Sequence, residues 1–429
     1  MFNRFVFAFS ARVLAAVFGF FITVLISRRY GIESLGHYSL FVLLLSLADI
    51  ILGLGLPSAN YYFGSKNLFS RKTIITASLL LPLAASLLLF GAVRILEAAG
   101  LTGAGIFAPY TRIIKQLPPL FFAYTASSAI NGLYLAEKRI SVYSLFQYGT
   151  KAVLFGLLLL FSFSRRSFQH SVYISYLVLY YSVLAYMVAA EWKNLTVSGM
   201  AAYVKKCVPF GLYSAGSNII SFMNYRFDYL LVSAFWGLKQ LGYYSIAVGL
   251  AEAVWHIPSA FGISAMSART DVNKDPSGYQ KKLRLAMAAS LACIAVLAVS
   301  GKGIILLFYG RNYLVSYYCM LALLAGAFAF CVPKAVASVF IIEGNPQVNT
   351  MIALGVLIVN TVLNFLLIPG YGIMGASIAT SLSYIAAFAA TAFYYRRLLS
   401  GRREKTGSDG FSAGLKPDES RGSRDEGSL

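Results

Sequence analysis

Ser27–Val42 reads SRRYGIESLGHYSLFV, and Ser233–Val248, 206 residues later, reads SAFWGLKQLGYYSIAV. Seven of the sixteen aligned positions are identical. The same offset aligns Glu137 with Glu343 without a gap. In a membrane chain, two matching halves are typical of transporters, in which two helix bundles rock around a site that lies between them.

The composition is that of a chain embedded in a lipid bilayer. Hydrophobic residues make up 58% of the sequence and charged residues only 12%. Apolar stretches of about 20 residues, the length that crosses a hydrocarbon core, recur from end to end. Their approximate centres are Val17, Leu47, Ala85, Ala126, Leu154, Leu179, Ile220, Ala251, Ala295, Ala327, Val356 and Ile385. The sequence predicts an all-α polytopic membrane protein with about 12 transmembrane helices in two six-helix repeats.

The halves are predicted to share one orientation, because an even number of spans returns the chain to the side where it started. The repeats are then parallel and related by an axis along the membrane normal. The expected divisions are a bundle over residues 1–192, a cytoplasmic linker over 193–206, a bundle over 207–398 and a disordered cytoplasmic tail over 399–429. The tail is polar and rich in Gly and Ser, so it cannot bury enough apolar surface to fold.

Basic residues in the loops predict which face is cytoplasmic. With the N-terminus inside, the inner segments before the tail carry 14 Lys and Arg, against 10 in the outer loops. This bias places both termini in the cytoplasm. The net charge of +20 therefore reflects membrane topology and gives no reason to expect a nucleic-acid partner.

No motif indicates a metal site or an enzyme. The four cysteines have no ligand-like spacing, and most lie in apolar runs, as expected for small core residues: Cys207, Cys293, Cys319 and Cys331. The chain has no phosphate-binding glycine loop, zinc motif, nucleophile elbow or paired carboxylates. We expect no cofactor, with H⁺ or Na⁺ as candidate coupling ions.

Four basic residues lie within predicted spans: Arg12, Lys151, Arg226 and Lys334. An ionised side chain that faces lipid is costly, so each should face a water-filled cavity or a partner. We expect the four to form a cationic substrate-binding cavity. For Lys151 the alternative is that its amine extends to the inner end of the span.

Acidic residues and one histidine within the spans are candidates for coupling or gating: Asp49, Asp228, Glu252 and His256. Arg226 and Asp228 are two apart, so they point in different directions and should not pair with each other. Each needs a partner on another helix, and an interhelical ion pair is the alternative to a functional role. Glu252 and His256 share a helix face, which favours either a structural contact or a proton relay.

Three segments resemble one family, the bacterial polysaccharide-unit flippases. They are GIESLGHYS at Gly31–Ser39 with LGLPSANYYFG at Leu54–Gly64, RFDYLLVSAFWGLKQLGYYSIAVGLAEAVWHIPSAFG at Arg226–Gly262, and IPGYGIMGASIATSLSY at Ile368–Tyr384. These O-antigen-type flippases belong to the multidrug/oligosaccharidyl-lipid/polysaccharide (MOP) exporter superfamily, so the resemblance implies a V-shaped bundle like that of its MATE transporters. The lipid II flippases of this superfamily typically carry two additional helices, whereas this chain ends in a polar tail.

The resemblance implies a function in building surface polysaccharide, such as O-antigen, capsule or exopolysaccharide. Such proteins flip a polyprenyl-diphosphate-linked oligosaccharide across the bacterial cytoplasmic (inner) membrane, beside polysaccharide polymerase and assembly proteins. Two alternatives are a cation-coupled multidrug exporter of the same superfamily and a membrane-embedded glycan polymerase or ligase. A drug exporter predicts an acid-rich cavity, and a polymerase predicts a large outer loop, which the spacing of the spans leaves no room for.

Overall fold

The computed structural model describes residues 2–100, 111–163, 167–259, 276–342, 345 and 347–412, and this part of the chain is helical throughout, without strands. The first half contains α1 (Phe2–Tyr30), α2 (Ile32–Leu52), α3 (Leu56–Ser65), α4 (Arg71–Ala98), α5 (Thr111–Ala136), α6 (Ile140–Ser144), the π-helix η3 (Leu145–Gly149), α7 (Thr150–Ser162), α8 (Phe168–Glu191) and η4 (Trp192–Asn194). The second half contains α9 (Met200–Glu252), η5 (Ala253–Trp255), α12 (Pro276–Phe308), η6 (Arg311–Tyr313), α13 (Leu314–Ile342) and α14 (Gln347–Ser412).

Glycines with positive φ divide the longest helices. Gly237 has φ 76° and ψ 179°, so α9 consists of one segment before it and one after it. Gly372, with φ 57°, divides α14 in the same way. Residues that carry a Cβ atom rarely adopt these backbone angles, which explains why glycine stands at both breaks. With these breaks counted, α9 and α14 each contribute two helical segments, which brings the number of helices in the described residues roughly into line with the number predicted from the sequence.

The surface of these helices is apolar, as a bilayer requires. By length and composition alone, eight of the described helices can cross a membrane, α14 being counted once. Large side chains on them are open at the surface, including Leu88 at 76% and Val299 at 84% exposure. Such a surface is stable only in contact with lipid, so the chain is a multi-pass membrane protein.

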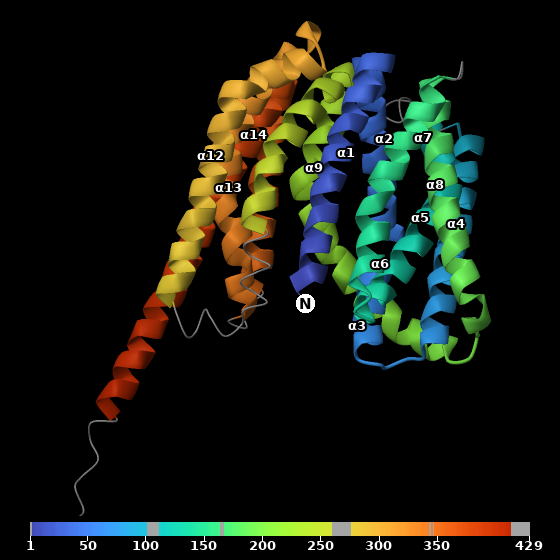
Figure 1. The fold of residues 1–429 in the computed structure, drawn as a ribbon, viewed down its shortest axis with the longest axis horizontal. Helices are drawn as coiled ribbons and strands as arrows, with labels where there is room; N and C mark the ends of the chain where they lie inside the picture. The colour runs from blue at the N-terminus through green and yellow to red at the C-terminus, as the bar shows by residue number, and fades with distance from the viewer. Residues whose placement is uncertain are drawn as a thin grey trace, which may run out of the picture.

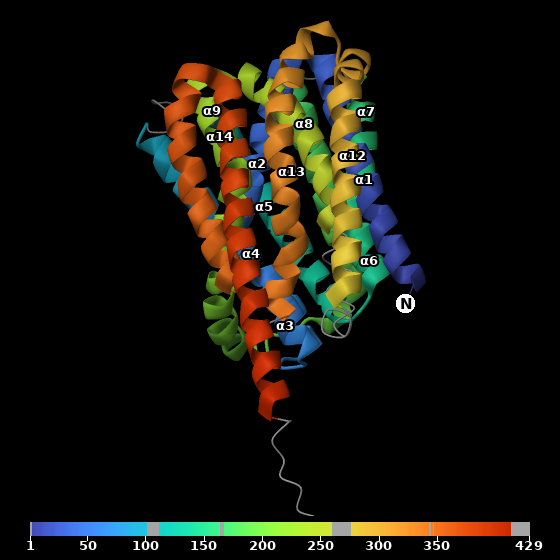
Figure 2. The same ribbon diagram turned by 90° about the vertical axis from the view of Figure 1, so that its left-hand side faces the viewer.

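The helices form two groups that meet at α2 and α9. Figure 1 shows α12, α13 and α14 on one side and α4 to α8 on the other, with α1, α2 and α9 between them. The α12–α14 group slants away from α1 toward the face on which the N-terminus lies, and the end of α14 extends beyond that same face. Figure 2 shows α12, α13 and α14 side by side in this outer group. The N-terminal end of α1 and the C-terminal end of α14 therefore lie on one face of the molecule.

The repeated glycines form the contact between the halves. A Cβ on Gly36 would lie 1.8 Å from the carbonyl oxygen of Leu238, and a Cβ on Gly242 would lie 2.3 Å from the carbonyl oxygen of Ile32. Gly36 and Gly242 are equivalent under the 206-residue offset, and so are Ile32 and Leu238. The contact is thus reciprocal, and it allows α2 and α9 to pack backbone against backbone.

Two predicted boundaries differ from the observed helices. Helix α9 begins at Met200, inside the stretch predicted as a linker, because Tyr203 packs fully buried against the first half. Helix α14 continues to Ser412 rather than ending before a disordered tail at residue 399. A membrane span supplies the helical turns onto which Arg, Glu and Lys, which are good helix formers, can add. Residues 413–429 lie outside the described residues.

Candidate transport cavity

A cavity of about 1070 Å³ lies between the two halves, bounded by α1, the second segment of α9 with η5, and residues of α13 and the end of α12. Its wall is mostly apolar. Its polar lining residues are Arg12, Thr23, Ser245, Glu252, Trp255, His256, Ser259, Tyr309 and Lys334. It is the place where a rocking pair of bundles would hold a substrate.

Two of the predicted cations, Arg12 and Lys334, line this cavity. Among the described residues, neither forms an ion pair with a carboxylate. A cation without a protein counter-ion in a largely apolar cavity can be compensated by an anionic ligand.

Lys334 is held by aromatic side chains. Its ammonium donates a hydrogen bond to the Tyr225 hydroxyl at 2.9 Å. It also lies over the rings of Tyr225 at 4.7 Å, Trp255 at 5.4 Å and Phe330 at 5.5 Å. Ring quadrupoles stabilise the charge without neutralising it, so Lys334 keeps its positive field at the cavity wall.

Arg226 lies beside the cavity and is already paired. Its guanidinium donates to both carboxylate oxygens of Glu252, at 2.6 and 2.9 Å, and lies over the Tyr229 ring at 5.1 Å. The partner is on the far side of the break in α9, so Arg226 and Asp228 do not pair with each other, as predicted. This geometry matches the ion-pair alternative for Arg226.

Glu252 and His256 lie on the same cavity, as their spacing on one helix face predicted. The carboxylate of Glu252 is directed to Arg226. A guanidinium offers two parallel donors and a full charge, which favours its bidentate pairing with the carboxylate.

The two remaining acids lie inside the bundles and away from the cavity lining. Asp228 is 5% exposed, accepts from the Tyr229 backbone N–H at 2.8 Å and also accepts from the Tyr244 hydroxyl. Asp49 accepts from the Thr125 hydroxyl at 2.5 Å, within the first half. Each carboxylate thus accepts hydrogen bonds from uncharged donors.

Lys151 lies in a different place from the other predicted cations. It lines a separate pocket of about 170 Å³ between α5, η3, α7 and α8. The sequence could not separate it from Arg12 and Lys334, because the assignment depends on how the helices pack around one another.

The end of the cavity opposite the termini is closed by contacts between the halves. Thr23 and Tyr309, which line the cavity, share a hydrogen bond of 2.7 Å. Beyond them, Arg28 donates to the carbonyl oxygens of Leu307 and Phe308 at the C-terminal end of α12, the latter at 2.7 Å. A cation at a helix C-terminus satisfies carbonyls that have no partner within the helix.

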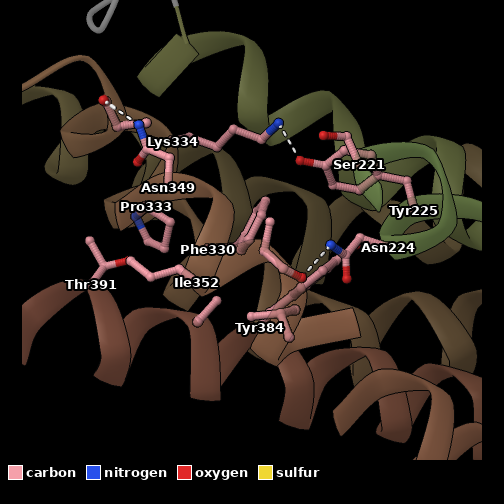
Figure 3. A pocket seen from close by; sticks show the side chains of 14 residues that line it. Ser221, Asn224, Tyr225, Phe330, Pro333, Lys334, Asn349, Ile352, Tyr384 and Thr391 are labelled. Carbon is pink, nitrogen blue, oxygen red and sulfur yellow. Dashed lines mark hydrogen bonds between the residues drawn. The ribbon is translucent and has the colours of Figure 1, made fainter. Parts of the chain in front are cut away.

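A second pocket of about 270 Å³ adjoins the cavity inside the second half, between α9, α13 and α14. Figure 3 shows Lys334 reaching toward Tyr225, with Asn224 and Tyr384 nearby. Asn224 donates to the carbonyl oxygen of Ala353 at 2.8 Å, while its own side-chain oxygen is buried and has no partner among the described residues. Asn224 was not predicted as a site residue from the sequence, although an amide within an apolar span is a visible signal.

Comparison with known proteins identifies the family. The family model described as "Polysaccharide biosynthesis protein" matches residues 25–318, more than half of the chain. The chain belongs to this family. A Shigella flexneri protein provisionally named an O-antigen transporter is 25% identical over 223 residues. That match covers 51% of this chain and 53% of the relative, so the chain matches about half the length of this curated relative.

Solved structures share the fold. One is titled lipid II flippase MurJ, inward closed conformation, with a TM-score of 0.69, 15% identity and coverage of 90% of this chain and 87% of that one. Another is an inward-facing multidrug resistance MATE family transporter of the MOP superfamily, with a TM-score of 0.67, 15% identity and coverage of 92% and 96%. The MATE-like fold predicted from the sequence is confirmed. These relatives are named as transporters or flippases, which agrees with the prediction of a non-enzymatic protein.

Proposed function

We propose that this protein flips polyprenyl-diphosphate-linked oligosaccharide repeat units across the bacterial cytoplasmic membrane by alternating access, for surface polysaccharide biosynthesis. Polymerase and assembly proteins of the same pathway are the proposed partners. The observation that carries the proposal is the pair of cations, Arg12 and Lys334, that line one largely apolar cavity between the halves without carboxylate partners of their own.

The chemistry of the substrate fits this cavity. A diphosphate joined to a glycan cannot cross hydrocarbon unaided, because removing its hydration is very unfavourable. Arg12 would replace that water with a bidentate interaction and Lys334 with a point charge. The polyprenyl tail would stay in the bilayer, since the apolar surface it needs is already there.

The direction of transport follows from the proposed topology. With both termini in the cytoplasm, the cavity in this structure is sealed on the periplasmic side by the contacts around Thr23 and Arg28. Substrate would enter from the inner leaflet, and the sealed end would open to release it. H⁺ or Na⁺ is the proposed coupling ion, with Asp49 and Asp228 as candidate sites because both are carboxylates enclosed within a bundle.

A cation-coupled multidrug exporter is the second candidate. Glu252 lines the cavity, and a carboxylate there would suit a cationic drug. However, Arg226 already neutralises Glu252, which leaves the cavity with a surplus of positive charge. The charge balance therefore favours the anionic substrate.

The decisive experiment measures the leaflet in which lipid-linked repeat units accumulate. Cells that carry Arg12→Ala with Lys334→Ala should retain these units on the cytoplasmic side and lose surface glycan. Two charge-assisted contacts, each contributing about 1.5–3 kcal/mol, should lower transport by at least roughly tenfold.

The control is Lys239→Ala, which removes an exposed cation outside the cavity and should leave transport unchanged. Wild-type glycan levels in the double variant would contradict the proposal. Accumulation of units on the periplasmic side of cells lacking the protein would point to a polymerase or ligase instead.

A further inference from the structure

The 206-residue repeat also relates two pockets inside the bundles. One is the pocket in the first half that contains Lys151, and the other is the pocket in the second half that contains Lys334. Seven lining positions of the first coincide with lining positions of the second when the offset is applied, for example Tyr124 with Phe330 and Gln147 with Ala353. Both pockets are therefore produced by the way the fourth, fifth and sixth spans of each half pack.

Only the pocket in the second half is shared with the central cavity. Lys334 lines both spaces, whereas no lining residue of the first-half pocket also lines the cavity. Lys334 thus forms part of the wall of both spaces, and a ligand that contacts it from the central cavity lies next to the second pocket. A group bound to Lys334 in the cavity would have its neighbouring chemical unit at the pocket entrance.

The walls of the second pocket combine aromatic faces with uncharged polar groups. Phe330 and Tyr384 stack with ring centroids 4.5 Å apart, and Tyr225 stands beside them. Ser221, Asn349 and Thr391 add hydroxyl and amide groups. The described lining contains no carboxylate, so a cationic ligand would gain no charge compensation there.

The side chain of Asn224 indicates which chemical class of ligand the second pocket can bind. Asn224 as a whole is 9% exposed, and its side-chain oxygen, which is an acceptor only, is buried and has no partner among the described residues. A buried acceptor without a donor is unfavourable unless a ligand or water supplies one. A hydroxyl or an acetamido N–H would satisfy it, whereas a phosphate oxygen would not.

We propose that this pocket binds one sugar of the carried glycan, the unit next to the diphosphate, while Lys334 at the pocket entrance holds the phosphate. A sugar ring offers apolar C–H faces to aromatic side chains and hydroxyls to amides, which matches this lining. The volume, near the lower end of the roughly 300–1,000 Å³ range of ligand pockets, suits a single ring. This inference rests on the proposed flippase function and adds a specificity site to it.

The test compares two soluble probes on the purified full-length protein. N-acetylglucosamine 1-phosphate carries both the sugar and the phosphate, and inorganic phosphate carries only the anion. Binding is titrated by saturation-transfer NMR. Asn224→Ala should weaken the binding of the sugar phosphate by roughly tenfold, as expected for one lost hydrogen bond, and leave the binding of inorganic phosphate unchanged. Lys334→Ala should weaken both probes.

Asn131→Ala is the matched control. Asn131 lines the equivalent pocket in the first half and also has a buried side-chain oxygen without a partner, so its removal should change neither probe. Ser221→Phe provides a second test that does not disturb the Asn224 hydrogen bond to Ala353. Ser221 is exposed at the pocket, and a phenyl ring there should exclude the sugar phosphate while sparing phosphate.

The outcomes separate this inference from the function on which it rests. Unchanged sugar-phosphate affinity in both Asn224→Ala and Ser221→Phe would overturn the sugar site, even if Lys334→Ala still weakens phosphate. An equal loss of both probes in Asn224→Ala would also overturn it, because the residue would then act on the anion. Failure of Lys334→Ala to weaken either probe would count against the flippase proposal itself.

Discussion

At the scale of single residues, the charge of Arg226 is compensated within the protein by Glu252. Replacing either partner should therefore affect the stability of the fold. The guanidinium and the Glu252 carboxylate are joined by two hydrogen bonds, and their side chains are 29% and 22% exposed. Breaking a fully buried pair by removing one partner costs about 3–5 kcal/mol, since the other charge is left uncompensated. Partial exposure of both groups makes the cost here smaller.

We therefore expect Glu252→Gln to lower the thermal unfolding midpoint of the purified protein, because it leaves Arg226 without a counter-charge. The paired replacement Arg226→Met with Glu252→Leu should restore most of the lost midpoint. Circular dichroism during heating measures both. If the paired variant is stable and still supports surface glycan export, Arg226 is structural. Loss of export despite full stability would instead give Arg226 a role in transport.

Two of the four cations predicted from the sequence line the cavity, and the sequence did not show the partners of the others. Arg12 and Lys334 could be chosen because a charge within a span needs a cavity. The pairing of Arg226 with Glu252, 26 residues away, depends on the break at Gly237, which turns the two segments of α9 toward each other. Asn224 carries no formal charge, so the expectation that charges within spans face a cavity does not apply to it.

At the scale of helices, the reciprocal contact of Gly36 and Gly242 sets how closely the halves approach. A methyl group on Gly36 would overlap the Leu238 carbonyl, which is backbone and cannot move aside without shifting a helix. Gly36→Ala with Gly242→Ala should therefore separate α2 from α9. We expect a lower thermal unfolding midpoint and weaker disulfide cross-linking between cysteines introduced at Ile32 and Leu238.

Gly216→Ala is the control for this change. Gly216 lies in α9, and a Cβ there would meet nothing within 4 Å. It should leave the cross-linking intact and raise helix stability slightly, because alanine is the better helix former. Equal cross-linking in all three proteins would show that the close contact does not hold the halves together.

The repeated motif predicted where the helices lie better than it predicted where they end. Gly31 and Gly237, equivalent under the offset, both adopt positive φ, at 86° and 76°, and both separate the first two spans of their half. The sequence showed the glycines and the spans. It could not show that α14 continues to Ser412, because a polar helical extension has no hydrophobic period.

At the scale of the whole molecule, the proposed alternating access requires the sealed end to open. That motion would break the contact that Arg28 makes between the two halves. It joins the end of α1 to the carbonyls of Leu307 and Phe308 across the two halves. Arg28→Ala should favour the state that is open on the face opposite the termini. A cysteine at Ala16, which lines the cavity, should then react faster with an impermeant maleimide applied to that face.

The neighbouring arginine supplies the comparison. Arg29 donates to the carbonyl oxygen of Ser162, a contact that stays within the first half and should not change between states. Arg29→Ala should therefore leave the labelling rate at the wild-type level. Similar acceleration by both substitutions would indicate general loosening rather than opening of the seal.

The glycine contact between α2 and α9 has the geometry of an isologous dimer interface. Gly36 meets the carbonyl of Leu238, and its equivalent Gly242 meets the carbonyl of Ile32, which is the equivalent of Leu238. The two surfaces are therefore the same surface used twice. A half-length polypeptide with one copy of the motif would make both contacts with a second identical molecule. Because one chain carries both copies of the surface, the two halves can differ elsewhere: Arg226, Asp228 and Lys334 are matched in the first half by Phe20, Ile22 and Ser128.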